Sequence, residues 1–377
     1  MTRPRRVLVA PDKFKGSLDA ADVAEAVATG VRQARPGTEV RCVPVADGGD
    51  GTLAAALAAG YRPVEVTVQG PTGQPVTTAF ARRGGTAVVE LADACGLGRL
   101  PGGVPDPLLA SSRGLGEVLV AALDDGCSEI VLGIGGSAST DGGSGMLAAL
   151  GAALTTGEGS SVREGGAGLL DVAHLDLTGL HPRLAAARLV VACDVDNPLT
   201  GLTGAAHVYA PQKGAASRDV TLLDRALERW ADVVTNATGA DLRSAPGGGA
   251  AGGVGFAALA ALGAELSPGI DLVLDLVGFD DLLADRDLVI TGEGSLDAQS
   301  LHGKAPVGVA ARARAEEVPV VAVCGRRALE DEVLRKAGIE AAYALLDLEP
   351  DVTRCLRDPV PLLERLGGRI ADVHLGA

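Results

Sequence analysis

The chain has 377 residues, of which 47% are hydrophobic and 21% are charged, and its formal net charge is −15. This length exceeds what one hydrophobic core normally serves, so we expect two domains. Nucleic acids and anionic membranes are bound by basic surfaces, so the acidic charge argues against both as partners.

The N-terminal segment alternates strands and helices. The apolar run RVLVAPD at residues 6–12 predicts a buried strand, and Ser17 or Asp19 can cap a helix that stops at Arg35. A second strand leads into the glycine-rich stretch VADGGDGT at residues 45–52, and TLAAALAAG predicts the next helix. Strands and helices at this spacing indicate a parallel sheet.

The middle of the chain is richer in turns. Residues 65–97 predict antiparallel strands joined by Pro/Gly turns, and two further strands are predicted at residues 129–136 and 189–195. Glycine in a helix interior costs roughly 1 kcal/mol relative to alanine. We therefore expect the glycine-rich segment 246–264 to begin as a turn and to enter a helix at about Gly255.

The C-terminal quarter returns to the alternating pattern. Strands are predicted from DLVIT, PVVAVCG and AAYALLD. Helices are predicted at about residues 304–316, 328–337 and 360–371.

These elements predict an α/β fold with two domains. Both chain ends, residues 1–65 plus 282–377, are expected to form one Rossmann/flavodoxin-like parallel-sheet domain. Residues 66–281 are expected to form an inserted mixed α/β domain, with the active site in the cleft between the two.

Polar, glycine-bearing loops follow the predicted strands. They occupy residues 10–19, 45–52, 133–145, 192–201 and 291–304. Ligands of open α/β sheets bind at the carboxyl ends of the strands, so we expect these loops to form one composite site.

The loops carry both cations and carboxylates. The cations that can meet a phosphate or carboxylate are Lys13, Lys15, Lys213 and Lys304. The stretch Gly135-Gly136-Ser137 can direct backbone N–H groups and a hydroxyl at an anion. The oxygen ligands suited to Mg²⁺ are Asp47, Asp50, Asp141, Asp194, Asp196, Glu293 and Asp297. This combination fits phosphoryl transfer, in which catalysis is mostly positioning and charge neutralisation.

Two nucleotide-binding motifs were tested against the same loops. A Walker A motif is absent, because Gly303-Lys304 is followed by Ala305 and residue 298 is Ala. Gly133-x-Gly135-x-x-Ala138 matches part of the dinucleotide fingerprint, but no strand ending in an acid follows roughly 20 residues later. NAD binding is therefore kept only as an alternative.

Taken together, the loops resemble those of the type I glycerate kinase family. The resemblance rests on VLVAPDKFKGSL, PVADGGDGT, GIGGSASTDGG, VACDVDNPLTG, PQKGA, PGGGAAGGVGFA and DLVITGEGSLDAQSLHGKAPVGVA, in the family's order from about residue 7 to 325. This chain has Lys13 where many members have Ser, and Asp50 where the family often has Glu. The shorter side chain of Asp50 weighs against its direct contact with a ligand.

The resemblance implies an ATP- and Mg²⁺-dependent kinase that acts on D-glycerate. The expected product is 2-phosphoglycerate, with 3-phosphoglycerate as the alternative. Asp194 is the first candidate for the general base or a metal-linked carboxylate, whereas Asp196 is expected to cap its own turn. Lys15 is expected to neutralise charge on the phosphoryl group or on the glycerate carboxylate.

The remaining site residues follow from the same loops. Asp47 is a further catalytic candidate, and Asp47, Asp194 and Glu293 are the candidate metal ligands. Candidate substrate- and nucleotide-binding residues are Asp12, Lys13, Ser17, Gly48, Gly49, Gly135, Gly136, Ser137, Asp141, Asn197, Lys213, Ser295 and Lys304. Among these, Lys213 and Lys304 are expected to contact phosphate.

Two other functions stay open at this point. One is a nicotinamide-dependent oxidoreductase acting on a small hydroxy acid, and the other is a non-catalytic ligand-binding regulator. Six cysteines without a CxxC pair and an N-terminal apolar run too short for a signal peptide favour the cytoplasm. We expect a monomer or homodimer whose partners are glycerate and ATP.

Overall fold

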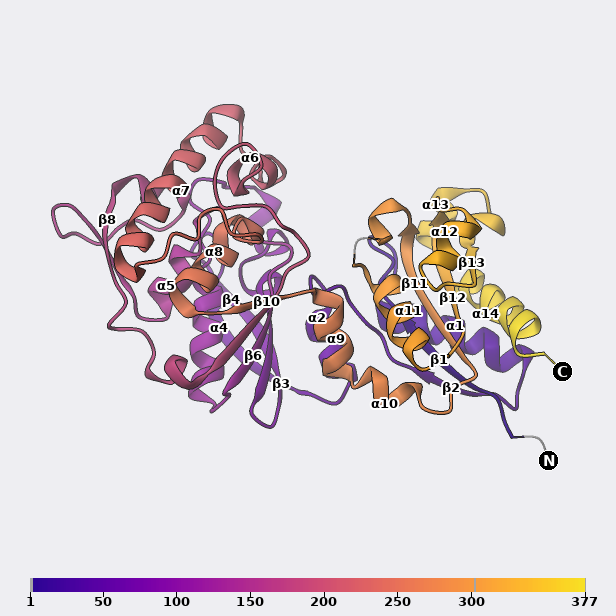
Figure 1. Cartoon of the computed structure of the whole chain (residues 1–377). Coiled ribbons are helices and arrows are strands. Elements are labelled where there is room, and N and C mark those ends of the chain that lie inside the picture. Colours follow the sequence, from indigo (N-terminus) through magenta and orange to yellow (C-terminus); the bar gives the residue numbers. More distant parts are fainter. Residues whose placement is uncertain (1–2, 302, 377) are drawn as a thin grey trace. The chain divides into compact units, whose positions relative to one another are not determined.

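The fold was obtained as a computed structural model that describes residues 3–301 and 303–376. The chain forms two compact units (Figure 1). Unit 1 comprises residues 1–47, 54–60 and 268–377, and unit 2 comprises residues 48–53 and 61–267. Within the described residues, no helix combines the length and the apolar character that crossing a membrane requires.

Unit 1 contains a five-stranded parallel sheet. Its strands are β1 Arg6–Pro11, β2 Glu39–Cys42, β11 Leu288–Leu296, β12 Val320–Arg327 and β13 Ala341–Ala344. They lie in the order β13-β12-β11-β1-β2, and every neighbouring pair is parallel. Numbered within the unit this is the flavodoxin-like order 2-1-3-4-5. The prediction of a parallel-sheet domain formed by both chain ends is therefore confirmed.

Helices cover both faces of this sheet. They are α1 Ala20–Ala34, α2 Thr52–Ala58, α9 Gly269–Val277, α10 Phe279–Leu283, α11 Ala305–Ala315, α12 Asp331–Lys336, α13 Val352–Arg357 and α14 Val360–His374. Alternate residues of β1 point to opposite faces. Val7 and Val9 pack with α1 and α14, which lie together in Figure 1, whereas Leu8 and Ala10 pack with α9 and α11. Asp19 caps α1 by accepting the N–H of Asp22.

Unit 2 contains a six-stranded mixed sheet. Its strands are β3 Arg62–Gln69, β4 Pro75–Arg83, β5 Thr86–Glu90, β6 Glu129–Gly133, β9 Arg188–Ala192 and β10 Glu265–Ser267. In the order β10-β9-β6-β5-β4-β3 the first four strands are parallel, and β4 is antiparallel to both β5 and β3. The predicted antiparallel strands within residues 65–97 are confirmed. A separate hairpin pairs β7 Ala153–Thr156 with β8 Val172–Asp176.

One hydrophobic core joins the helices of unit 2 to the mixed sheet. The helices are α3 Leu91–Cys95, α4 Arg113–Asp124, α5 Ser144–Ala149, α6 Ala205–Tyr209, α7 Ser217–Thr238 and α8 Ala250–Leu262. Residues Ala251, Gly252 and Gly253 have positive φ angles, so the regular part of α8 begins at Val254. This agrees with the predicted turn that enters a helix at about Gly255.

The boundaries of the two units fall at other residues than the boundaries that we predicted for the two domains. Residues 62–65 lie in β3 of the mixed sheet, whereas α9 and α10 pack against the parallel sheet of unit 1. The placement of the active site in a cleft between the domains stays a prediction.

Candidate active site

In unit 1, acidic residues gather at the carboxyl ends of β1, β2 and β11. Asp12 follows β1 and Glu293 lies in β11, and these two strands are neighbours at the point where the strand order reverses. This switch point is where flavodoxin-like sheets bind ligands. Asp12 is 8% exposed and Glu293 is 6% exposed. Asp47 lies after β2 and interacts electrostatically with both carboxyl groups.

Burial and neighbouring carboxyl groups favour the protonated forms of these acidic residues. Burial, the nearby Asp47 carboxylate and Glu293 raise the pKa of Asp12 to about 7, although Lys13 opposes the shift. Burial also raises the pKa of Glu293, against the effects of Ser300 and Lys304. A cation bound here would instead favour the ionised carboxylates, because an opposite charge nearby lowers a carboxyl pKa.

Glu293 has one carboxylate oxygen available. Its Oε2 lies 3.7 Å from the Lys304 Nζ, whereas its buried Oε1 has no hydrogen-bond partner among residues 3–301 and 303–376. Lys304 is also the N-cap of α11, an 11-residue helix. Pro306 has no N–H, and Val307 and Gly308 both donate to the Lys304 carbonyl, so this end offers an anion the helix dipole rather than a set of unpaired N–H groups. Unit 1 thus places the carboxyl group of Glu293 beside the N-terminus of α11.

The other predicted residues of unit 1 differ in exposure and bonding. Lys15 is exposed and Lys13 is half-buried, with its N–H donating to Asp12 Oδ1. The Ser17 hydroxyl donates to the Leu356 carbonyl, and the Ser295 hydroxyl donates to Asp297. Both serine hydroxyl hydrogens therefore have partners within the protein.

In unit 2, the glycine loop after β6 is closely packed. Cβ atoms at Gly133 and Gly135 would lie 2.9 Å from the Gly48 carbonyl oxygen and the Gly49 Cα, respectively. The predicted binding residues Gly48 and Gly49 therefore lie against the loop that carries Gly135, Gly136 and Ser137. The structure brings these residues of two separate sequence motifs together.

Lys213 lies under the same loop. It is 2% exposed, and its ammonium donates to Ser137 Oγ at 2.7 Å and to the Ser139 carbonyl at 2.5 Å. Burial lowers the Lys213 pKa to about 8, although Asp141 and Cys95 oppose the shift. The side chain is therefore mostly protonated at neutral pH.

Asp141 lies in the protein interior. It has no exposed surface, and its carboxylate accepts the N–H and hydroxyl of Ser112, both at 2.8 Å, and the N–H groups of Gly143 and Gly145. Burial raises its pKa despite these bonds. Asp141 thus fixes the loop after β6 to the start of α4.

Asp194 lies in the exposed loop after β9. Asn197 holds this loop, because its Nδ2 donates to the Thr203 carbonyl and its Oδ1 accepts the Tyr209 hydroxyl. The expected cap by Asp196 is replaced by these bonds, since the Asp196 side chain forms no hydrogen bond with any described residue. Both polar atoms of the Asn197 amide are therefore bonded within the protein.

Glu90 was not identified from the sequence. This last residue of β5 is 4% exposed, and its carboxylate accepts the N–H of Gly51 with both oxygens at 3.2 Å and the N–H of Leu53 at 3.0 Å. Glu90 therefore fixes the segment that carries Gly48 and Gly49. The available signal was a single carboxylate that ends the apolar strand TAVVE and precedes the apolar residues of α3.

Glu90 is expected to make stability depend on pH. Burial is the main cause that raises its pKa from 4.5 to about 7. Between these values the folded chain keeps a proton that the unfolded chain has released, so the free energy of unfolding falls as the pH rises. Deprotonation of Glu90 is expected to lower the free energy of unfolding by on the order of 3 kcal/mol at most.

Urea unfolding of the wild type and Glu90→Gln at about pH 5.5 and about pH 8 measures this loss. The variant should lose less stability over this interval, whereas the exposed Glu65→Gln control should follow the wild type. Equal pH dependence in all three proteins would contradict the prediction.

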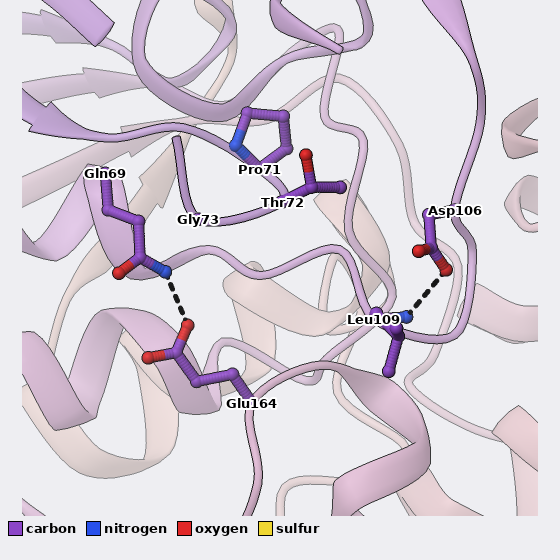
Figure 2. Close-up of a pocket in the computed structure, with 7 residues that line it drawn as sticks. All are labelled: Gln69, Pro71, Thr72, Gly73, Asp106, Leu109 and Glu164. Carbon is purple, nitrogen blue, oxygen red and sulfur yellow. Dashed lines mark hydrogen bonds between the residues drawn. The ribbon is translucent and has the colours of Figure 1, made fainter. Parts of the chain in front are cut away.

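A cavity of about 230 Å³ lies elsewhere in unit 2 (Figure 2). Its lining residues are Gln69, Pro71, Thr72, Gly73, Asp106, Leu109 and Glu164. Gln69 donates to Glu164 at 2.6 Å, and Asp106 accepts the N–H of Leu109. None of the predicted site residues lines the cavity, and its two carboxylates would repel an anionic substrate.

Comparison with known proteins identifies a family over nearly the whole chain. The sequence matches the model of the glycerate kinase family over residues 7–375. It is 44% identical to a glycerate kinase of Bacillus subtilis (strain 168) over 344 residues, which are 90% of each chain. It is 42% identical to a glycerate 2-kinase of Escherichia coli (strain K12) over 344 residues, again 90% of each chain.

A solved structure shares the fold. The crystal structure described as a glycerate kinase 2 from Salmonella typhimurium LT2 matches with a TM-score of 0.85 and 40% sequence identity. The match covers 98% of both chains.

Proposed function

The chain belongs to the glycerate kinase family, and on that premise we propose that it transfers the γ-phosphoryl group of ATP to the 2-hydroxyl of D-glycerate, giving 2-phosphoglycerate. The 2-hydroxyl is proposed as the acceptor because the Escherichia coli relative is named glycerate 2-kinase. The comparisons support the kinase prediction and give no support to the nicotinamide-dependent alternative.

Unit 1 is proposed to bind Mg²⁺ and the phosphates of ATP. Mg²⁺ binds through one or two carboxylates together with substrate phosphates and water. The buried Glu293 Oε1, which has no hydrogen-bond partner among the described residues, and the nearby Asp47 carboxyl group fit this requirement. In the part of the chain that the structure describes, no group of three or more His, Cys, Asp or Glu side chains could hold a metal ion. Bound Mg²⁺ would supply positive charge that neutralises the phosphates.

Lys304 and Lys15 are proposed to meet the phosphate oxygens. Lys304 lies at the N-terminus of α11, where the helix dipole adds to its charge. Lys15 is exposed in the loop after β1, so its ammonium is accessible to a phosphate. Both lysines would offset negative charge that builds up during the transfer.

Unit 2 is proposed to bind glycerate. The 2-hydroxyl oxygen forms the new bond to the γ-phosphorus, while the bond from that phosphorus to the bridging oxygen breaks and ADP leaves with the electron pair. The Asp194 carboxylate accepts the hydroxyl proton in this scheme. Asn197 and Tyr209 hold the loop that presents Asp194.

The proposal is tested by supplying both cosubstrates at once. ADP release with ATP and Mg²⁺ should require D-glycerate and should not occur with glycerol, which lacks the carboxylate. NADH formation from NAD and D-glycerate is measured in parallel. ATP hydrolysis without glycerate, or NADH formation, would overturn the proposed function.

We also propose a cytoplasmic location. The six cysteines are free thiols in the structure, and a reducing compartment keeps thiols in this state.

A further inference from the structure

The positive charge of Lys213 is not paired with a carboxylate. Among the described residues its ammonium bonds only to neutral oxygens, the Ser137 hydroxyl and the Ser139 carbonyl. Asp141 acts on it through space, but the oxygens of Asp141 are occupied by Ser112 and the glycines that follow it. A buried charge without an ionic partner is costly, so this position favours an anionic ligand.

The loop above Lys213 offers further donors. Because Ser137 Oγ accepts a hydrogen bond from Lys213, its own hydrogen is free to point toward a ligand. Gly136 and Cys95 use their carbonyls to pair with Leu97 and Ala138. The N–H groups of Gly135, Gly136 and Ser137 form no hydrogen bond with any residue that the structure describes.

We infer that Gly135, Gly136 and Ser137, with Lys213 behind them, bind the carboxylate of glycerate; this inference rests on the proposed function. These four residues offer one positive charge and several neutral hydrogen-bond donors. This combination matches a carboxylate, which is planar and carries a single negative charge. The triphosphate carries more charge and is matched by Mg²⁺ and the lysines of unit 1. Lys213, predicted from the sequence as a phosphate contact, is thus assigned to the acceptor substrate.

The topology of unit 2 supports this assignment. Strands β6 and β9 are parallel neighbours, with Gly133 paired to Ala192 at their carboxyl ends. The loop that carries Ser137 and the loop that carries Asp194 therefore leave the same edge of the sheet from adjacent strands. In glycerate the 2-hydroxyl is on the carbon next to the carboxylate. A carboxylate held by the first loop would leave this hydroxyl for Asp194.

The test removes the charge of Lys213 and the hydroxyl of Ser137 in separate variants. Lys213→Met keeps the length of a buried side chain, and Ser137→Ala is a milder change in case the lysine variant does not fold. The control is Thr78→Val, because Thr78 is a buried threonine of β4 that lies outside the site loops. A hydrogen bond to a charged group is worth about tenfold or more in affinity. We expect KM for D-glycerate to rise by about tenfold in Ser137→Ala and by about 100-fold in Lys213→Met.

Two further measurements distinguish binding of the substrate carboxylate by these residues from a purely structural role. KM for ATP should stay within about threefold of the wild type. The wild type should prefer D-glycerate over its neutral amide, and Lys213→Met should lose most of this preference. A rise in KM for ATP instead would assign these residues to phosphate binding. An unchanged preference of Lys213→Met for the acid over the amide would overturn the inference. If the wild type uses neither compound, it is the proposed function that fails.

Discussion

The Asp194→Asn variant is expected to lose about 10²- to 10⁴-fold in kcat. Asparagine keeps the size of the side chain but cannot take the proton of the glycerate hydroxyl. The loop should keep its conformation, because it is held by Asn197 through Thr203 and Tyr209. Since binding of glycerate is assigned to other residues, KM should change little. Initial rates of ADP release over a range of D-glycerate concentrations measure both quantities.

Asp196→Asn is the matched control for this experiment. It removes the same charge from the same exposed loop, two positions further along the chain. An effect of general electrostatics would lower the rate equally in both variants. Equal loss in the two proteins, or an Asp194→Asn rate above about one tenth of the wild type, would contradict the role of Asp194 as base.

The Glu293→Gln variant is expected to require about 100-fold more Mg²⁺ for half-maximal activity. Even residues that only orient metal ligands are worth about 10- to 100-fold in metal affinity, so loss of a direct ligand should reach the upper part of that range. Burial raises the Glu293 pKa, so a neutral glutamine should be tolerated by the fold. Titration of activity with Mg²⁺ at saturating ATP and glycerate measures the change.

Asp297→Asn serves as the comparison for Glu293. Asp297 belongs to the same segment, and it accepts the Ser295 hydroxyl and the Gln299 N–H. Its Mg²⁺ requirement should remain close to that of the wild type. If Glu293→Gln shows the wild-type Mg²⁺ requirement, Glu293 is not a metal ligand.

The parallel-sheet unit could be predicted from sequence because its strands are buried on both faces. Such strands read as continuous apolar runs, as in residues 7–10 and 288–290. The helix from Ala20 was marked by the Asp19 cap and by the arginine, proline and glycine that follow it. Local signals and tertiary packing agree here, which is the condition for reliable prediction.

The inserted unit was less predictable, and α7 was missed. Its buried residues Val220, Leu223, Leu227, Trp230 and Val234 have helical spacing, so the signal was present. By contrast, α4 begins Arg-Gly-Leu-Gly, and its two early glycines weaken a helical pattern. The mixed sheet also depends on pairings between distant segments, which local patterns do not specify.

The site loops were visible in the sequence, but the bonding of individual side chains was not. Asp141 and Asp194 both follow apolar strands, yet one is buried against Ser112 and the other is exposed. The difference arises from the position of Ser112, 29 residues earlier in the chain. Glu90 likewise acts on Gly51 across 39 residues. Contacts over such separations depend on the assembled sheet.

Phosphorus NMR of the products formed from D-glycerate and ATP with Mg²⁺ is the most direct measurement. The wild type should give the resonance of 2-phosphoglycerate together with ADP, and Asp194→Asn should give neither at a comparable rate. Formation of 3-phosphoglycerate would contradict transfer to the 2-hydroxyl. Formation of ADP and inorganic phosphate alone would contradict glycerate as the acceptor.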